Sequence, residues 1–218
     1  MDVQARVESL NIGRIKLLEG HSKEELSAIV KQPTEEVLFL SPTHLTGDEQ
    51  ADTVHHGGTD KAVCVYSYVH YPYWEEQLGR NFLPGAFGEN VTIHSLTESD
   101  VRIGDTFRWG EAILQVSQPR KPCYKLAVRH QVPKLALYVE QTGFSGYYLR
   151  VCKTGHVSKS DPMILVERDL HNVTVADANQ IMFHGKQDVQ GIQRLLDVPA
   201  LSASWRQPLL SRLEKLGQ

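Results

Sequence analysis

The stretch 118–126, Gln-Pro-Arg-Lys-Pro-Cys-Tyr-Lys-Leu, restricts the conformation of this chain more than any other. Pro119 and Pro122 bracket a basic pair, and Cys123 follows the second proline directly. A proline fixes its own φ and biases the residue before it toward an extended conformation, so the segment predicts a stiff connector. Residues 124–130 are predicted to form a helix after it, because proline is favoured in the first turn of a helix.

Cys123 is therefore expected at a helix N-terminus, with Arg120, Lys121 and Lys125 close to it in sequence. The positive end of the helix dipole and the neighbouring cations both favour a thiolate over a thiol. A thiolate ligates a soft metal or attacks an electrophile. The alternative interpretation is a buried structural cysteine beside a solvated basic loop, since free cysteine is among the most buried residue types.

Composition is that of an ordinary globular protein. The 218 residues are 41% hydrophobic and 22% charged, with a formal net charge of −3, which fits one large domain or one domain with a small appendage. The chain has no domain-wide basic excess, so we expect no nucleic-acid partner. It begins without the basic and apolar regions of a signal peptide, and its apolar runs are too short to span a bilayer. We therefore expect a cytoplasmic protein without a membrane anchor.

The cysteine count limits the redox chemistry that the chain can carry. Three widely spread cysteines predict a reducing compartment and no disulfide framework. A plant-type iron–sulfur cluster takes four cysteines, so we expect no iron–sulfur cluster in this chain. Cys64, inside an apolar run, and Cys152, which alternates with Arg150, are predicted to be packing residues. Electrons for any redox reaction must then arrive from another protein.

Short apolar runs separated by glycine turns predict a strand-rich domain over residues 1–166. Strands are expected over 6–18 with a break at 11–13, and over 37–40, 62–66, 102–109, 112–116, 146–152, 155–157 and 163–168. Helices are expected over 21–30, 70–78 and 134–141. Residues 167–218 change in character and predict a unit of three helices over 174–183, 188–196 and 202–216, with Pro208 bending or dividing the third. That unit shows no obvious chemistry.

Two glycine loops lead into strands. In the first, Gly57 and Gly58 follow His56 and precede Lys61, and a glycine pair lets the backbone take positive φ and bind an anion through its amides. A plain turn with exposed histidines remains the alternative. The second loop, 84–90, carries Gly88, Glu89 and Asn90 at its tip. These residues either bind a ligand or only form the turn.

Segments 56–63, 85–92 and 118–123 together resemble the MOSC family, the molybdenum-cofactor-sulfurase C-terminal domain. Supporting matches are 100–105 and 147–151, and in order and spacing the resemblance covers roughly residues 50–165. The C-terminal helices resemble the 3-alpha extension of stand-alone bacterial members. Ser160 departs from the pattern, which has glycine there, and this affects a turn.

The resemblance implies a compact, Greek-key-like β-barrel with short helices, in a mainly β (α+β) chain. It also implies a molybdenum–pterin cofactor (molybdopterin) with Cys123 as the direct metal ligand. We take Cys123, His56 and Glu89 as candidate catalytic residues. Candidate cofactor-binding residues are Gly57, Gly58, Lys61, Gly88, Asn90, Arg120 and Lys121.

The family branch implies an enzyme that reduces N-hydroxylated bases or amines in detoxification, with a separate flavin or iron–sulfur protein as electron donor. A second hypothesis is a sulfur carrier or cofactor-handling module in which Cys123 bears a persulfide. A third is a non-catalytic cofactor-binding or interaction protein whose helical tail docks a partner. A homodimer is left open.

Overall fold

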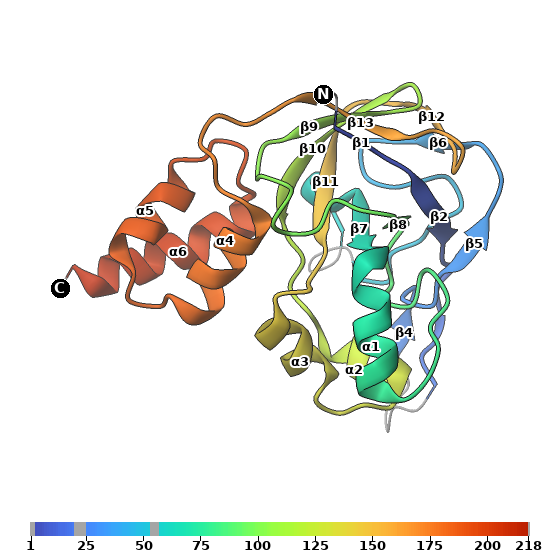
Figure 1. Ribbon diagram of the computed structural model, residues 1–218, viewed down its shortest axis with the longest axis horizontal. Coiled ribbons are helices and arrows are strands. Elements are labelled where there is room, and N and C mark those ends of the chain that lie inside the picture. Colours follow the sequence, from blue (N-terminus) through green and yellow to red (C-terminus); the bar gives the residue numbers. More distant parts are fainter. Residues whose placement is uncertain (1–2, 20–24, 53–56, 218) are drawn as a thin grey trace.

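A curved sheet forms the body of the molecule (Figure 1). The computed structural model describes residues 3–19, 25–52 and 57–217, and within them the main sheet has nine strands. In pairing order they are β1 (Gln4–Ala5), β13 (Met163–Glu167), β9 (Thr106–Trp109), β10 (Ala112–Pro119), β11 (Tyr147–Lys153), β7 (Val63–Ser67), β8 (Val91–Ile93), β2 (Val7–Ile12) and β5 (Gln32–Thr34). The β7–β8 pair is parallel and the other pairs are antiparallel.

The N-terminal strand connects the two ends of this sheet. Gln4 of β1 pairs with Ile164 at one end, whereas Leu10 of β2 pairs with Val91 near the other end. Only Arg6 separates β1 from β2, so the chain crosses from one end to the other almost without interruption. The sheet is thereby drawn into a half-barrel, and the predicted mainly β, α+β fold is confirmed.

Two short sheets complete the strand-rich part, one pairing β3 (Lys16–Leu17) with β4 (Leu26–Ser27) and the other β6 (Leu38–Leu40) with β12 (Gly155–Val157). The helix predicted over 21–30 is wrong in its described part, because β4 stands there. Backbone pairing between β3 and β4, extended by Leu18 N donating to Glu25 O (2.8 Å), overrides a weak local helix signal. Residues 20–24 lie outside the described part.

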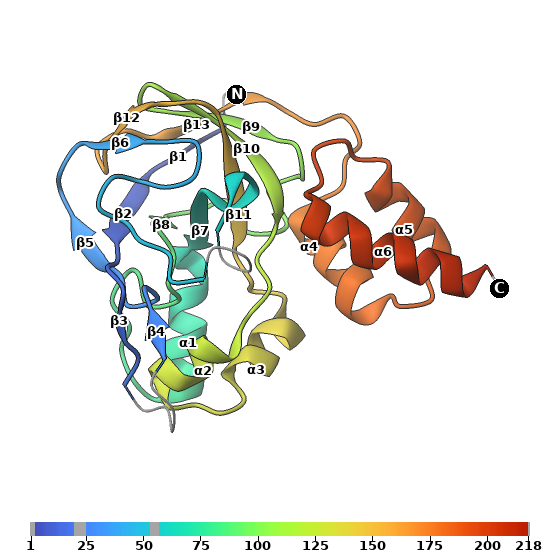
Figure 2. The same ribbon diagram turned by 180° about the vertical axis from the view of Figure 1, so that it is seen from behind.

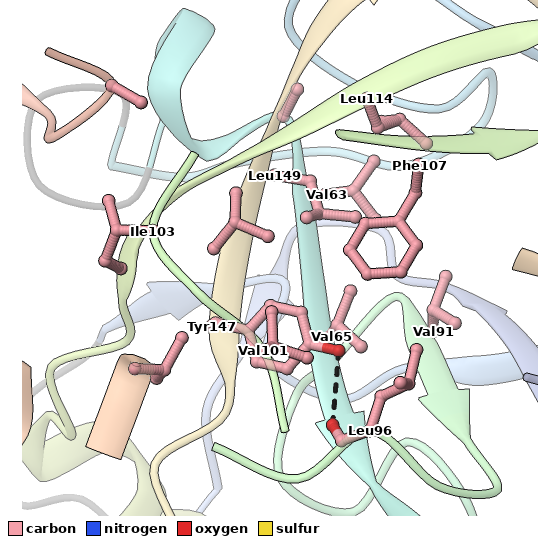
Figure 3. Close-up of a cluster of buried hydrophobic side chains, with 14 of the residues drawn as sticks. Val63, Val65, Val91, Leu96, Val101, Ile103, Phe107, Leu114, Tyr147 and Leu149 are labelled. Atoms are coloured by element: carbon pink, nitrogen blue, oxygen red, sulfur yellow. Dashed lines mark hydrogen bonds between the residues drawn. The ribbon is translucent and has the colours of Figure 1, made fainter. Parts of the chain in front are cut away.

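Apolar side chains of the central strands fill the inside of the half-barrel. Figure 3 shows Val63 and Val65 of β7 facing Leu149 of β11 and Phe107 of β9 across this core. Alternation along each strand points one set of side chains inward, which is why the period-two pattern predicted these strands. The hydroxyl of Tyr147 lies at this core and donates to Leu96 O (3.3 Å; Figure 3).

Three helices, α1 (Tyr71–Leu78), α2 (Tyr124–His130) and α3 (Leu135–Thr142), lie together at one end of the half-barrel (Figure 2). They confirm the helices predicted over 70–78, 124–130 and 134–141. Glycines in the left-handed conformation end α1 and α3, at Gly79 (φ 63°) and Gly143 (φ 73°). An aromatic cluster centred on Tyr66, Trp74 and Phe87 packs between these helices and the sheet.

The C-terminal unit stands to one side of the sheet and contains α4 (Val175–Asn179), α5 (Val189–Leu196) and α6 (Ala203–Leu216), with a π-helical turn over Gln180–His184. Thr174 and Asp177 form a capping box at the start of α4, where the sequence predicts a helix. Pro208 lies inside α6 and does not divide it. No helix within the described residues is long and apolar enough to cross a membrane.

The boundary between residues 166 and 167 stays a prediction. One hydrophobic cluster is continuous from the half-barrel, at Leu114, into the helical unit, at Val175 and Trp205. The prediction that Cys152 is a packing residue is wrong: β11 runs past the core at its end, and the thiol is exposed.

Candidate functional site

The proline-bracketed segment leads from the end of β10 to the start of α2. Arg120 N donates to Gly146 O (3.0 Å), and this hydrogen bond attaches the segment to the residue that directly precedes β11. Cys123 is the N-cap of α2, with extended backbone angles (φ −121°, ψ 160°), and it is half-buried. The structure therefore confirms the predicted position of Cys123 at a helix N-terminus.

Cys123 lies on the border of two adjoining hollows, which together form the cleft. The inner hollow encloses about 600 Å³ and the outer about 1230 Å³ of space between protein atoms, part of it open solvent. Both are lined by Asp52, Lys61, Cys123, Lys125 and Tyr148. The inner hollow is also lined by Ser27, Ala28, Ile29, Lys31, Asp48, Glu49, Gln50, Ala51, Cys64, Gly88, Asn90 and Arg120. The outer hollow adds Glu25, Gln118, Lys121, Pro122, Tyr124 and Ser204.

Arg120 is a buried cation that faces the inner hollow. The residue is only 7% exposed, and among the ion pairs of the described residues none includes it. Burial lowers the pKa of Arg120, whereas the neighbouring Cys64 and Tyr148 raise it, and the net shift is upward. The guanidinium therefore stays charged. A buried charge without a carboxylate partner is costly unless a ligand compensates it, so this side chain suits an anion in the hollow.

Lys31 and Asp48 form a buried ion pair in the wall of the same hollow, which the sequence analysis missed. Asp48 also accepts hydrogen bonds from Gly13 N (2.7 Å) and from Asn90 Nδ2 (2.8 Å). The Asn90 Oδ1 atom accepts from Cys64 N (3.1 Å). Asn90 thus lines the cleft as predicted, but both ends of its side-chain amide are held by the protein. No local motif marks Lys31 or Asp48, because only the fold brings them together.

Glu89 does not line the cleft. Its carboxylate is fully buried and accepts hydrogen bonds from Tyr71 Oη (2.5 Å), Gly85 N (2.9 Å), Phe87 N (3.0 Å) and Thr92 Oγ1 (2.7 Å). Four donors satisfy most of the acceptor capacity of a carboxylate. The structure places Glu89 as the centre of the second glycine loop rather than beside Cys123, and the predicted catalytic role has no geometric support.

Gly88 brings the second glycine loop to the inner hollow. Its φ is +80°, and a Cβ there would lie 2.7 Å from Ile29 Cγ1, so the position requires glycine on both counts. The first loop contributes differently. Gly57 is buried and Gly58 (φ +96°) begins the 3₁₀ turn Thr59–Lys61, but neither lines the cleft.

The first glycine loop brings Lys61 to the cleft, and the cysteine segment brings Lys121 and Lys125 in addition to Arg120. Burial lowers the pKa of Lys61, which lines both hollows. Burial, with Lys61 adding to it, also lowers the pKa of Lys121, which lines the outer hollow. The predicted residue His56 lies outside the described part of the chain.

A second thiol faces the inner hollow. Cys64 is buried in β7 as predicted, yet it lines the hollow together with Cys123. Burial raises the pKa of Cys64 to about 11, so this thiol is neutral at physiological pH. The strand pattern could not separate a cysteine that faces the core from one that faces a cleft.

The cleft combines a half-buried thiol, an uncompensated guanidinium and two lysines of lowered pKa. The described residues hold no group of three or more His, Cys, Asp or Glu side chains that could bind a metal by themselves. One thiolate with surrounding cations is a donor set that suits a soft metal whose other ligands belong to an anionic cofactor. Such a set fits a molybdenum ion bound to a pterin dithiolene phosphate.

Comparison with known proteins gives related sequences and structures. The chain is 45% identical over 208 residues to YflK of Bacillus subtilis, covering 95% of this chain and 94% of that one. It is 40% identical over 198 residues to YiiM of Escherichia coli, covering 89% and 88%. A protein of Gibberella moniliformis named "Reductase" is 37% identical over 175 residues, which are 78% of this chain and 31% of that protein. The crystal structure of YiiM from Geobacillus stearothermophilus superposes with a TM-score of 0.83 at 39% identity, covering 96% of this chain and 99% of that one.

Two family models match in chain order. The MOSC domain matches residues 52–164, and the YiiM-like, 3-alpha helix domain matches residues 173–216. The first match contains both glycine loops and Cys123, and the second contains α4, α5 and α6. The chain therefore belongs to the MOSC domain family, a family associated with the molybdenum cofactor, and it carries a YiiM-like 3-alpha helix domain at its C-terminal end.

Proposed function

We propose that this protein binds a molybdenum–pterin cofactor in the cleft and reduces N-hydroxylated bases or amines. The observation that supports it most is the half-buried Cys123 at the N-terminus of α2, in a cleft that also holds the uncompensated charge of Arg120. Cysteine sulfur is a ligand that soft metals prefer, and the guanidinium beside it suits an anionic cofactor.

Different residues of the cleft would bind the metal and the pterin. Cys123 would hold the molybdenum through its sulfur, and Arg120, Lys61 and Lys121 would meet the pterin phosphate. A guanidinium binds phosphate oxygens in a fork, which adds orientation to charge. Gly88 lets its loop pack directly against Ile29, and the two residues together form part of the wall of the inner hollow.

When bound, the cofactor supplies the two-electron chemistry. Reduction of an N–OH group to N–H consumes two electrons and two protons and releases water. The protein contributes binding, orientation and protons. Lys61 is suited to hold a proton in the cleft, because burial lowers its pKa and makes its ammonium a stronger acid than an exposed lysine. The electrons would come from a separate flavin or iron–sulfur protein.

The comparisons support this proposal in two ways. The MOSC family is associated with the molybdenum cofactor, and a fungal relative carries the name "Reductase". The persulfide hypothesis depends on the same Cys123, so the experiment must separate the two.

The test is the molybdenum and pterin content of protein purified without oxygen, for the wild type and for Cys123→Ala. We expect about one metal and one pterin per chain in the wild type, and loss of the metal in the variant. Cys152→Ala is the matched control, because that thiol is exposed and lines neither hollow. The wild type should then convert an N-hydroxylated base to its amine with a reducing dye as electron source.

Two results would contradict the proposal. Equal metal content in Cys123→Ala and wild type would remove Cys123 as a ligand. A persulfide on Cys123 by mass spectrometry, in protein without metal or pterin, would favour the sulfur-carrier function instead.

A further inference from the structure

The segment between α5 and α6 is joined to the end of β10 by a set of buried hydrogen bonds. Ser202 N donates to Ser117 O (3.0 Å). The Oε1 atom of Gln118 accepts from both Ser202 Oγ (2.7 Å) and Ser204 Oγ (2.8 Å). We call Gln118, Ser202 and Ser204 the serine clamp. Gln118 is 2% exposed, and a side-chain carbonyl has two lone pairs, so the two serines fill its capacity as an acceptor.

The same segment is connected to the first glycine loop through Arg150. That guanidinium donates to Ala200 O (2.7 Å) in the helical unit and to Asp60 Oδ1 (2.9 Å) in the loop. Ser117 Oγ donates in turn to Asp60 O (2.5 Å). The helical unit is therefore bonded to both segments that bring cations to the cleft.

The start of α6 also forms part of the cleft. Ser204 lines the outer hollow beside Lys121 and Cys123. The Nζ atom of Lys121 lies 5.5 Å from the centre of the Trp205 ring, a cation–π contact with the first turn of α6. The helical unit thus has direct neighbours on the cysteine segment, in addition to the clamp.

We propose that Gln118 is a positioning residue, through which the helical unit sets the place of Arg120 and Cys123 in the cleft. Gln118 directly precedes Pro119, and Pro122 follows within the same segment, so the connection has few freely rotating bonds. A displacement of Gln118 therefore also displaces Cys123, because the residues between them have few bonds whose rotation could compensate for it. The helical unit, which showed no chemistry of its own in the sequence, acts on the site from outside it. This inference rests on the proposed function for the importance of Cys123, but its test does not.

The test uses metal-free protein and measures how fast each cysteine is alkylated, resolved by peptide mass spectrometry. The double variant Ser202→Ala/Ser204→Ala removes both donors to Gln118 and leaves a buried acceptor without partners. We expect Cys123 to react at least about fivefold faster, the change that loss of one buried hydrogen bond produces in a local opening equilibrium. Buried Cys64 serves as the internal reference and should keep its wild-type rate, because local loosening of the segment does not expose β7.

Thr174→Ala is the matched control, since it removes the N-cap of α4 and weakens the helical unit while leaving the clamp intact. Its Cys123 rate should stay within about twofold of wild type. Ser204→Ala, an exposed position that is safe for folding, should give an intermediate rate. The proposal is overturned if the double variant reacts like the wild type, if Cys64 and Cys123 accelerate together, or if Thr174→Ala matches the double variant.

The cofactor gives an independent second readout. If the wild type binds molybdenum and pterin, the double variant should retain less than Thr174→Ala at equal folded fraction. If the wild type binds neither, the proposed function fails, but the alkylation result still decides whether Gln118 positions Cys123.

Discussion

The second glycine loop and the cysteine segment each contain a buried charge, but the two charges differ in their partners. Glu89 accepts four hydrogen bonds, two of them from backbone amides of its own loop, and does not line the cleft. Arg120 has no carboxylate partner among the described residues and faces the inner hollow. A buried charge whose bonding capacity is filled by the protein holds structure, whereas a buried charge without an ion-pair partner beside a cleft can interact with a ligand. Burial alone could not distinguish the two.

Replacing Glu89 should show the structural side of this difference. Glu89→Ala leaves Tyr71 Oη, Gly85 N and Phe87 N buried without their acceptor. We expect the free energy of unfolding to fall on the order of 4 kcal/mol, because several buried donors lose a charged partner at once. Urea denaturation followed by far-ultraviolet circular dichroism measures it. A variant as stable as the wild type would mean that the carboxylate does not hold the loop.

Acid should weaken the same loop. His130 Nε2 lies 2.8 Å from Ala86 O, and burial lowers the pKa of His130 to about 4, from an ordinary value near 6.5. The unfolded chain therefore binds more protons than the folded protein between pH 4 and 6.5, so stability falls as the pH drops through that window. The loss from this residue amounts to about 3 kcal/mol at most. His130→Asn should flatten the pH dependence of the urea midpoint; an unchanged slope would assign it to other groups.

Replacing Arg120 should leave stability nearly intact and remove ligand binding. Arg120→Met trades an uncompensated buried charge for an apolar side chain of similar length, so we expect no loss of unfolding free energy. Pterin and molybdenum retention should fall at least about tenfold, the effect of losing one charge-assisted contact.

The comparison variant for Arg120→Met is Arg129→Met, measured by urea midpoint and by cofactor content. Arg129 Nη1 donates to Ile29 O (2.6 Å) and Gly85 O (2.8 Å), so its loss should lower stability first. If Arg120→Met lowers the free energy of unfolding as much as Arg129→Met and keeps its cofactor, the charge of Arg120 holds structure and does not bind a ligand.

The smallest expected effect separates the two glycine loops. Gly88→Ala combines a positive φ with a Cβ 2.7 Å from Ile29 Cγ1. We expect it to lower the free energy of unfolding by about 2 kcal/mol or more. At Gly58 φ is +96°, but an added Cβ would meet no atom within 4 Å. Backbone strain alone should therefore lower the free energy of unfolding of Gly58→Ala by about 1 kcal/mol. Thermal midpoints of the two variants test the order. Equal losses would show that packing against Ile29 relaxes without cost.

Most of the fold followed from local patterns in the sequence. Short apolar runs between turns marked the central strands, Gly79 and Gly143 end helices in the left-handed conformation, and Thr174 with Asp177 caps the start of α4. These signals act within a few residues of one another. The segment 21–30 also carried a local helix signal, yet the pairing of β3 with β4 decided its described part.

The sequence motifs pointed to Cys123, Arg120 and Lys61, and the structure places all three in the wall of the cleft. The site was not predictable where residues meet only through the fold. Lys31 and Asp48 form an ion pair, but neither residue lies in a sequence motif. For Cys64, only the structure shows that the side chain faces the inner hollow. The sequence could not place Glu89, because a carboxylate at a loop tip gives the same pattern whether it points outward or into the loop. Ser202 and Ser204 lie about 80 residues from the glutamine they bind.

The crossing of the N-terminal strand has a consequence for how the chain is made. Gln4 is synthesised before every other strand of the main sheet, but its partner Ile164 is synthesised only after the rest of that sheet. Contacts between residues so far apart in sequence form late and slow the folding of a domain. During synthesis, the edges of β13 and β2 are therefore open to other strands until the two ends meet, and this interval is when the nascent protein is most prone to mispairing.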